Sequence, residues 1–189
     1  MTVRRTAAAL VVVPLFALAS CGGDPHKPPP YTPSPTPTES TSPTPTGPVA
    51  PTLPTAAKQH TRAGAEAYVR YYVDVLNHAT ATVDPPTLAK VTSKDCQGCQ
   101  NILGVLRDLD ASDSVVKGGV WTIKSFGIGC CPQPGSEHSF LVVIDRSRQV
   151  IVDGNGERKT YKGGEATFTF DAAWSADSGW RLTWLHFNG

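Results

Sequence analysis

Apolar residues recur at spacings of three and four between residues 61 and 79, which predicts a long amphipathic helix. Thr61 stands at the N-cap position, and the stripe opposite the apolar face holds the polar residues Arg70, Asp74 and His78. The apolar positions are Ala65, Val69, Tyr72, Val73, Leu76 and Ala79. We expect this face of the helix to lie against the core.

Two shorter helices are predicted next. Asp84 followed by Pro85 and Pro86 has the order of a capping residue and a first-turn proline, which indicates a short helix to about Val91. A third helix is expected to start at Ser93 or Asp95. Its predicted apolar face consists of Cys96, Cys99, Leu103 and Leu106, flanked by Ile102 and Leu109.

Beyond the polar segment 110–113 the hydrophobic period changes to two, which is typical of strands. Turn residues at 153–156 and 177–179 separate the later strands. The pattern predicts an α+β fold in which three N-terminal helices pack on a curved four-stranded antiparallel sheet. The expected strands are Val120–Ile128, Ser139–Val152 (long and bent), Ala166–Trp174 and Trp180–Phe187.

Composition limits the classes of partner. The chain has 189 residues, with 17 Lys and Arg against 16 Asp and Glu, for a formal net charge of +1. A nearly neutral chain has no excess of positive charge for a polyanion, so nucleic acid is not an expected partner. The globular part is expected over residues 56–189, which is enough for one domain.

The N-terminus is typical of a secretion signal over residues 1–20. Arg4 and Arg5 precede the apolar run Ala7–Ala19, which is shorter than the roughly 20 residues needed to span a bilayer. The segment Leu18-Ala19-Ser20-Cys21 resembles a bacterial lipoprotein processing site, in which Cys21 receives a lipid and cleavage follows Ser20. The resemblance predicts anchoring to the extracytoplasmic face of the cell membrane, with the bilayer bound through acylated Cys21. The alternative is an ordinary secreted protein in which Cys21 is incidental.

Residues 21–55 are expected to form a disordered linker after the lipidated Cys21. Between Pro25 and Pro54 there are 12 prolines and 10 serines or threonines, so almost nothing apolar is available for a core. Proline-rich chain favours an extended spacer conformation. A proline-rich recognition ligand is the alternative interpretation.

Four further cysteines are present, Cys96, Cys99, Cys130 and Cys131. An extracytoplasmic address and an even number favour structural disulfides on these four residues, with three possible connectivities. A redox motif at Cys96 and Cys99 is an alternative, but a thioredoxin-type site would follow a strand in a βαβ unit. A four-cysteine metal site would need two well-spaced pairs, which the adjacent Cys130 and Cys131 do not supply.

No catalytic, metal-binding or cofactor-binding residue is assigned from the sequence. Asp74 and His78 lie one helical turn apart, but their polar stripe is typical of a solvated helix face. The predicted strands contain His138, Asp171 and His186. Asp171 interrupts an aromatic strand, and a desolvated aspartate could serve as a general base.

A family resemblance is carried by five segments of the chain: His60–Tyr72, Asp95–Gln100, Gly118–Thr122, Tyr161–Gly164 and the final Gly179–Leu185. On these segments the chain resembles the nuclear transport factor 2-like fold, a cystatin-like α+β cone, and more narrowly a family of small actinobacterial lipoproteins of unassigned function. The resemblance covers roughly residues 56–189. It implies a cavity that in similar folds sometimes hosts isomerases or dehydratases.

Three functional hypotheses follow. The first is a non-enzymatic, membrane-tethered lipoprotein that binds a small apolar ligand or an envelope protein. The second is an isomerase-like or dehydratase-like enzyme with Asp171 or His138 in its cavity. The third is a thiol redox protein that uses Cys96 and Cys99.

Overall fold

The computed structural model describes residues 48–189. The predicted signal peptide, Cys21 and the linker up to residue 47 lie outside the described residues. The helices are η1 (Thr55–Lys58, a 3-10 helix), α1 (Arg62–Thr82), α2 (Pro85–Ala89) and α3 (Gln97–Ala111). The strands are β1 (Val115–Gly118), β2 (Trp121–Ile128), β3 (His138–Arg146), β4 (Gln149–Val152), β5 (Arg158–Tyr161), β6 (Gly164–Ser175) and β7 (Gly179–Phe187).

Helix α1 confirms the predicted amphipathic pattern. The Thr61 side chain accepts a hydrogen bond from the Gly64 N–H at the start of the helix. All six predicted apolar positions are buried, and Tyr68 and Val75 join them. The following helix α2 starts as expected, because Asp84 accepts from the Thr87 N–H and Pro85 occupies the first turn.

Helix α3 begins later than predicted. Its N-cap is Cys96, whose sulfur accepts from the Cys99 N–H at 3.2 Å, so the helix does not start at Ser93 or Asp95. The predicted apolar face is confirmed, since Cys96, Cys99, Leu103 and Leu106 are all buried.

The strands form two antiparallel sheets, where the sequence predicted one sheet of four strands. The four-stranded sheet has the order β2-β3-β6-β7, and the three-stranded sheet has the order β1-β4-β5. The predicted long strand Ser139–Val152 is in fact two strands, β3 and β4, that belong to different sheets. Strands β1 and β5 were not predicted; each has four residues, too few to establish an alternating pattern.

A common bend separates the two sheets. Gly118 and Gly119 have φ of 73° and 74°, in the left-handed region that interrupts a strand and favours glycine. On the neighbouring chain segment the Ser147 side chain accepts from the Val120 N–H, which closes the bend. A Cβ on Gly163 would lie 2.2 Å from the Arg146 carbonyl oxygen, so the third segment also needs glycine. All three chain segments therefore leave the four-stranded sheet at the same position along the strands, and this position is the bend between the two sheets.

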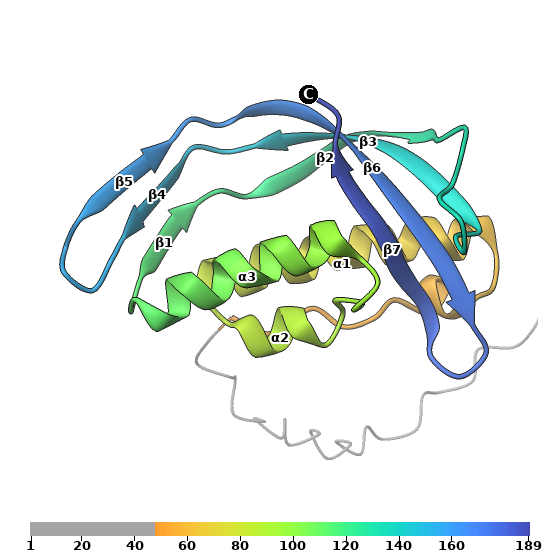
Figure 1. Cartoon of the computed structure of the whole chain (residues 1–189), viewed down its shortest axis with the longest axis horizontal. Helices are drawn as coiled ribbons and strands as arrows, with labels where there is room; N and C mark the ends of the chain where they lie inside the picture. The colour runs from red at the N-terminus through yellow and green to blue at the C-terminus, as the bar shows by residue number, and fades with distance from the viewer. Residues whose placement is uncertain (1–47) are drawn as a thin grey trace, which may run out of the picture. The chain divides into compact units, whose positions relative to one another are not determined.

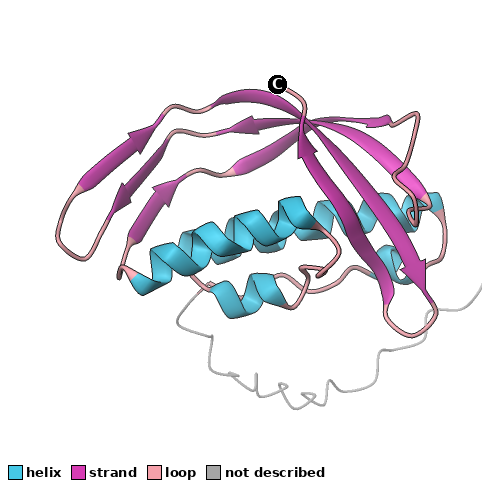
Figure 2. Cartoon of the chain, viewed as in Figure 1, coloured by secondary structure: helices cyan, strands magenta, loops and turns pink. Residues whose placement is uncertain are grey.

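The helices lie along one side of the strands (Figures 1 and 2). The core between α1 and the four-stranded sheet is filled by large side chains, among them Tyr72, Phe140, Phe170 and Leu182. By contrast, Val116 is the one buried hydrophobic residue that the three-stranded sheet contributes to the described part of the chain. This difference leaves space beside α3 on the side of the three-stranded sheet.

Candidate functional site: a hollow at the bend between the sheets

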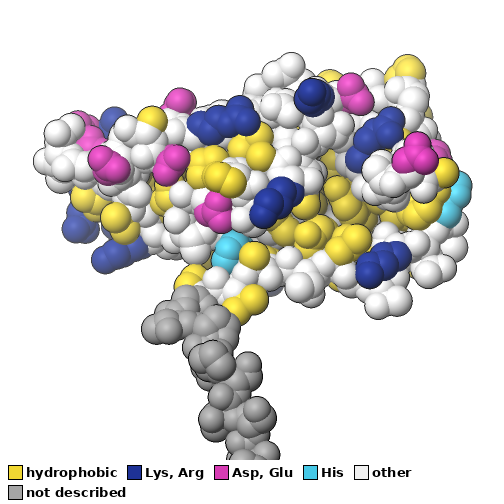
Figure 3. Space-filling model, turned by 90° about the horizontal axis from the view of Figure 1, so that it is seen from below, with side chains coloured by type: hydrophobic (Ala, Val, Ile, Leu, Met, Phe, Trp, Pro, Cys, Tyr) yellow, Lys and Arg dark blue, Asp and Glu magenta, His cyan; other side chains and the backbone are white. Residues whose placement is uncertain are grey.

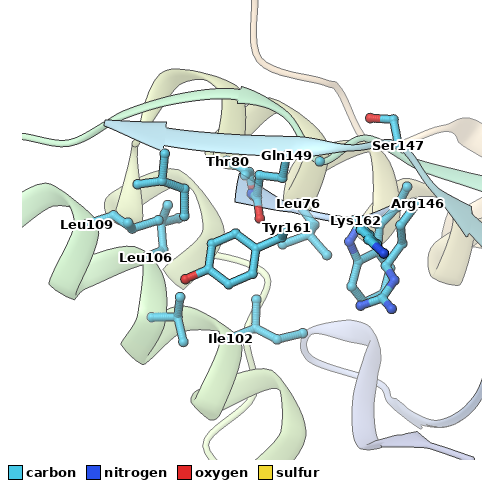
Figure 4. Close-up of a pocket in the computed structure, with 14 residues that line it drawn as sticks. Leu76, Thr80, Ile102, Leu106, Leu109, Arg146, Ser147, Gln149, Tyr161 and Lys162 are labelled. Carbon is cyan, nitrogen blue, oxygen red and sulfur yellow. The ribbon is translucent and has the colours of Figure 1, made fainter. Parts of the chain in front are cut away.

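A hollow of about 260 Å³ lies between helices α1 and α3 and the bend that separates the two sheets. Figure 4 shows side chains that reach it from both helices and from the strands above them. Its lining consists of Leu76, Thr80, Ile102, Val105, Leu106, Leu109, Gly119, Trp121, Arg146, Ser147, Gln149, Ile151, Tyr161 and Lys162.

The lining is polarised. Leu106 and Leu109 lie toward one end of the view in Figure 4, Arg146 and Lys162 lie toward the other, and Tyr161 lies between them. No aspartate or glutamate is among the lining residues. The hollow therefore combines an apolar wall with an uncompensated cationic end.

Arg146 occupies the last position of β3, where it pairs with Trp121 on one side and Gly164 on the other. Its Nε atom is buried and has no hydrogen-bond partner within residues 48–189. No ion pair in this part of the chain includes Arg146. Because a buried polar atom without a partner is costly, an acceptor supplied by a ligand would be stabilising here.

A second hollow, of about 410 Å³, adjoins the first along α3. The two share Ile102, Trp121 and Arg146, so these three residues form the wall between them. The other lining residues of the second hollow are Gly98, Asn101, Phe168, Leu185, His186 and Phe187.

Trp121 is fixed in this shared wall. The Asn77 side chain donates to the Trp121 carbonyl oxygen and accepts from the Trp121 N–H, both at 2.8 Å. The indole packs against Phe168 with ring centroids 4.7 Å apart. These contacts connect α1 to β2 and hold one wall of both hollows in place.

The hollows are open to solvent. Val105, Tyr161 and Phe187 line them, and their exposed fractions are 59%, 50% and 52%. On the face that Figure 3 presents, hydrophobic side chains form a band across the middle, with lysine and arginine side chains beside it. Exposed apolar area next to a concave surface is typical of binding sites.

Asp171, the predicted base, lies elsewhere. Its side chain is fully buried, and its Oδ2 accepts from the Gln133 N–H at 2.7 Å. Phe168 and Phe170 of the same strand belong to the core cluster, so strand alternation places Asp171 on the opposite face, under the loop between β2 and β3. Asp171 lines neither hollow. The expectation of a cavity base at this residue is therefore not met.

His138 begins β3, at the opposite end of that strand from Arg146. Its ring packs against Trp180, with centroids 5.5 Å apart. Beside it, His60 Nε2 and Glu137 Oε2 are hydrogen-bonded at 2.7 Å, a contact that lowers the pKa of Glu137 below its usual range. Of the predicted histidines, His186 reaches the second hollow and His138 reaches neither.

Two of the four cysteines form a disulfide, and the other two are free thiols. Cys96 and Cys99 are bonded to each other and fully buried, with Cα atoms 5.2 Å apart. Cys130 and Cys131 are exposed and unbonded, so the predicted pairing of all four residues is realised only at the helix. A hydrogen bond between the two thiols raises the pKa of Cys131. None of the four lines either hollow.

The polar stripe of α1 holds no metal cluster. Arg70 pairs with Glu66 at 2.6 Å, and its guanidinium lies over the Phe126 ring. Partial burial raises the pKa of Asp74, and Arg70 opposes that rise. Within residues 48–189 there is no group of three or more His, Cys, Asp or Glu side chains that could hold a metal ion.

Sequence reasoning did not select Arg146, Tyr161 or Lys162 as site residues. Hydrophobic periodicity identifies faces that are buried, whereas these side chains lie at strand ends beside a bend. The segments Gly118–Thr122 and Tyr161–Gly164, which carry the family resemblance, do meet at the hollow, and they were the available signal.

The sequence model of the family of unknown function DUF6318 matches residues 36–186. No curated protein matches the sequence. No helix in the described part of the chain is long and apolar enough to cross a membrane.

Several solved structures are similar to this chain at low sequence identity. A nuclear transport factor 2-like superfamily protein from Salmonella enterica is 13% identical, with a TM-score of 0.39, over 68% of this chain and 93% of that one. A ketosteroid isomerase-like protein from Erwinia carotovora is 12% identical, with a TM-score of 0.38, over 63% and 91%. The intermembrane space region of chloroplast protein ARC6 is 14% identical, with a TM-score of 0.43, over 68% and 97%. Likeness at this level carries no inference about activity.

Proposed function

This chain belongs to the DUF6318 family of unknown function, and from that premise we propose that it is a membrane-tethered lipoprotein whose domain binds a small, largely apolar ligand. The observation that carries the proposal is the open hollow between α1, α3 and the bend of the sheets. An enzymatic role receives less support, because Asp171 and His138 lie away from that hollow.

The anchor is supported by the order of features in the sequence. Basic residues, a short apolar run, small residues and Cys21 follow one another as they do at a lipoprotein processing site. In this proposal residues 1–20 are removed, Cys21 carries the lipid, and the proline-rich segment to residue 55 is a spacer. The ligand-binding domain would then stand on the extracytoplasmic side of the membrane.

The apolar wall of the hollow is suited to ligand binding because it is held open by fixed elements. Ile102 and Leu106 project from the well-packed helix α3, and Trp121 is fastened to α1 through Asn77. Apolar surface that a ligand covers contributes about 25 cal/mol per Å². A rigid wall gains this energy without a large ordering cost.

Binding can be tested with Nile red, a neutral fluorescent probe, added to the full chain carrying Cys21→Ser. We expect saturable binding with a blue-shifted emission. Ile102→Trp fills the wall that the two hollows share and should abolish it, whereas Arg107→Trp, on the exposed side of α3, should not. Equal binding by wild type and Ile102→Trp would refute this location.

Anchoring can be tested in cells by fractionation. Cys21→Ser should release the protein from the membrane fraction into the medium, and Cys130→Ser should leave it in place. Retention of Cys21→Ser in the membrane fraction would rule out the lipid anchor.

A further inference from the structure

We infer that the ligand of this hollow is a single-chain amphiphile with a carboxylate head, in which Arg146 and Lys162 hold the carboxylate and α3 holds the apolar chain. The inference rests on the proposed function of the hollow and names its ligand class. It follows from the charge and position of the two cations and from the burial of the Arg146 Nε atom.

The first step concerns Arg146. Its Nε is buried without a partner, although a guanidinium in a protein stays charged. The acidic residues beside it in the sheet do not compensate it: Asp145 and Glu165 are register partners of each other, next to the Arg146–Gly164 pair, and are both exposed. Strand alternation turns Asp145 to the other face of the sheet. The hollow therefore contains a cation for which residues 48–189 supply no anion.

The second step concerns the paired charges. Lys162 follows β5 directly, and it lines the same hollow as Arg146. The close approach of Gly163 to the Arg146 carbonyl oxygen fixes these two chain segments against each other. Two cations that line one hollow without an acidic side chain favour the binding of an anion there. The planar guanidinium can offer two parallel N–H donors, which match the two oxygens of a carboxylate.

The third step concerns the rest of the ligand. From the cationic end, the wall continues through Ile102 and Leu106 to Leu109 along one side of α3. A volume of about 260 Å³ is close to the lower limit of about 300 Å³ for small-molecule pockets. It suits one apolar chain better than a lipid with two. The adjoining hollow beyond Arg146 gives room for the head group and its water.

The test compares three probes that share one chain: dodecanoate, dodecan-1-ol and dodecyl phosphate. Each is used to displace Nile red from the full chain carrying Cys21→Ser, at pH 7 and below its micelle concentration. A charge-assisted hydrogen bond predicts that dodecanoate competes at least about tenfold better than dodecan-1-ol. Equal competition by acid and alcohol would overturn the inference. Dodecyl phosphate competing tenfold better than dodecanoate would overturn the choice of a carboxylate.

Two variants locate the effect. Arg146→Met keeps an unbranched apolar stem and removes the guanidinium, so it should still bind Nile red but lose the preference for acid over alcohol. Arg148→Met removes an equal charge two residues away, from an exposed side chain outside the hollows, and should keep the preference. An unchanged preference in Arg146→Met would refute its role. Failure of Nile red to bind wild type would instead count against the proposed function itself.

Discussion

Helix α1 contacts strands of both sheets, but the two sheets meet the helices in different ways. The four-stranded sheet presents large buried side chains such as Phe140, Ile144, Phe170 and Leu182. The three-stranded sheet contributes Val116 to the buried set, while β5 is exposed along its whole length. The four-stranded sheet therefore packs on the helices as a filled core, whereas the three-stranded sheet borders an open hollow.

This difference in packing predicts that the four-stranded sheet determines the stability of the fold and that the hollow determines ligand binding. In the filled region the free energy of folding comes from buried apolar area, so each large side chain there is expected to contribute strongly. In the open region Arg146, Tyr161 and Lys162 bury little apolar surface against the core. Their arrangement is typical of a binding surface. Substitutions there should change the affinity for a ligand more than the free energy of unfolding.

The largest expected effect comes from a matched pair of truncations. Phe170→Ala leaves a cavity in the filled core and should lower the free energy of unfolding by about 3–5 kcal/mol. Tyr161→Ala, at a half-exposed site on β5, should lower it by less than about 1 kcal/mol and weaken Nile red binding. Urea unfolding measures the free energy of unfolding of both variants. Similar losses for the two variants would break the distinction between the regions.

The cysteines allow a second contrast within the same chain. Replacing both Cys96 and Cys99 by Ala opens a loop of four residues, which predicts a loss of about 2 kcal/mol in unfolding free energy. Replacing both Cys130 and Cys131 by Ser, in an exposed loop, should leave the unfolding free energy unchanged. The measurement is thermal unfolding without reductant. A larger effect at the exposed pair would mean that its loop, and not the helix start, is covalently constrained.

The filled region was largely predictable from the sequence. Ala65, Val69, Tyr72 and Leu76 have helical spacing, and the caps at Thr61 and Asp84 follow from local hydrogen bonding, so short windows contain the information. The split of the sheet was less accessible. Gly118 and Gly119 are visible as turn residues, but their alignment with breaks in two other strands depends on long-range pairing.

The hollow was still harder to predict. Arg146 and Lys162 are separated by sixteen positions and line the same hollow because β3 and β6 pair beside the bend. An unpaired cation has no signature in periodicity or composition, since the whole chain is nearly neutral. Asp171 was a candidate base because it interrupts an apolar strand. In the structure its side chain accepts a hydrogen bond from the Gln133 N–H, on the face of the sheet opposite the core.

A third variant tests the boundary between the two regions. Asn77→Ala removes both hydrogen bonds that fasten Trp121 to α1 and leaves two backbone groups without partners. We expect a loss of about 1–2 kcal/mol in unfolding free energy, together with weaker Nile red binding. Asn155→Ala, in the exposed turn between β4 and β5, should alter neither. Loss of stability with unchanged probe binding would show that the wall does not depend on this contact.

The smallest expected effect lies at the far end of the filled sheet. Glu137 accepts from the Trp174 N–H and contacts His60, and its pKa is lowered chiefly by the hydrogen bond with His60. A lowered pKa in the folded state means that ionised Glu137 stabilises the fold above the ordinary glutamate pKa, and that this stabilisation is lost as the pH falls through the lowered value.

Glu137→Gln should therefore be less stable than wild type at pH 7 by less than about 1 kcal/mol, because the pair is exposed. The difference should shrink as the pH is lowered from 5 to 3, which thermal unfolding of both proteins across that range would measure. Nile red binding should be unchanged, since Glu137 lines neither hollow. A difference in melting temperature that stayed constant to pH 3 would mean that packing against Trp174, and not the charge, is what Glu137 contributes.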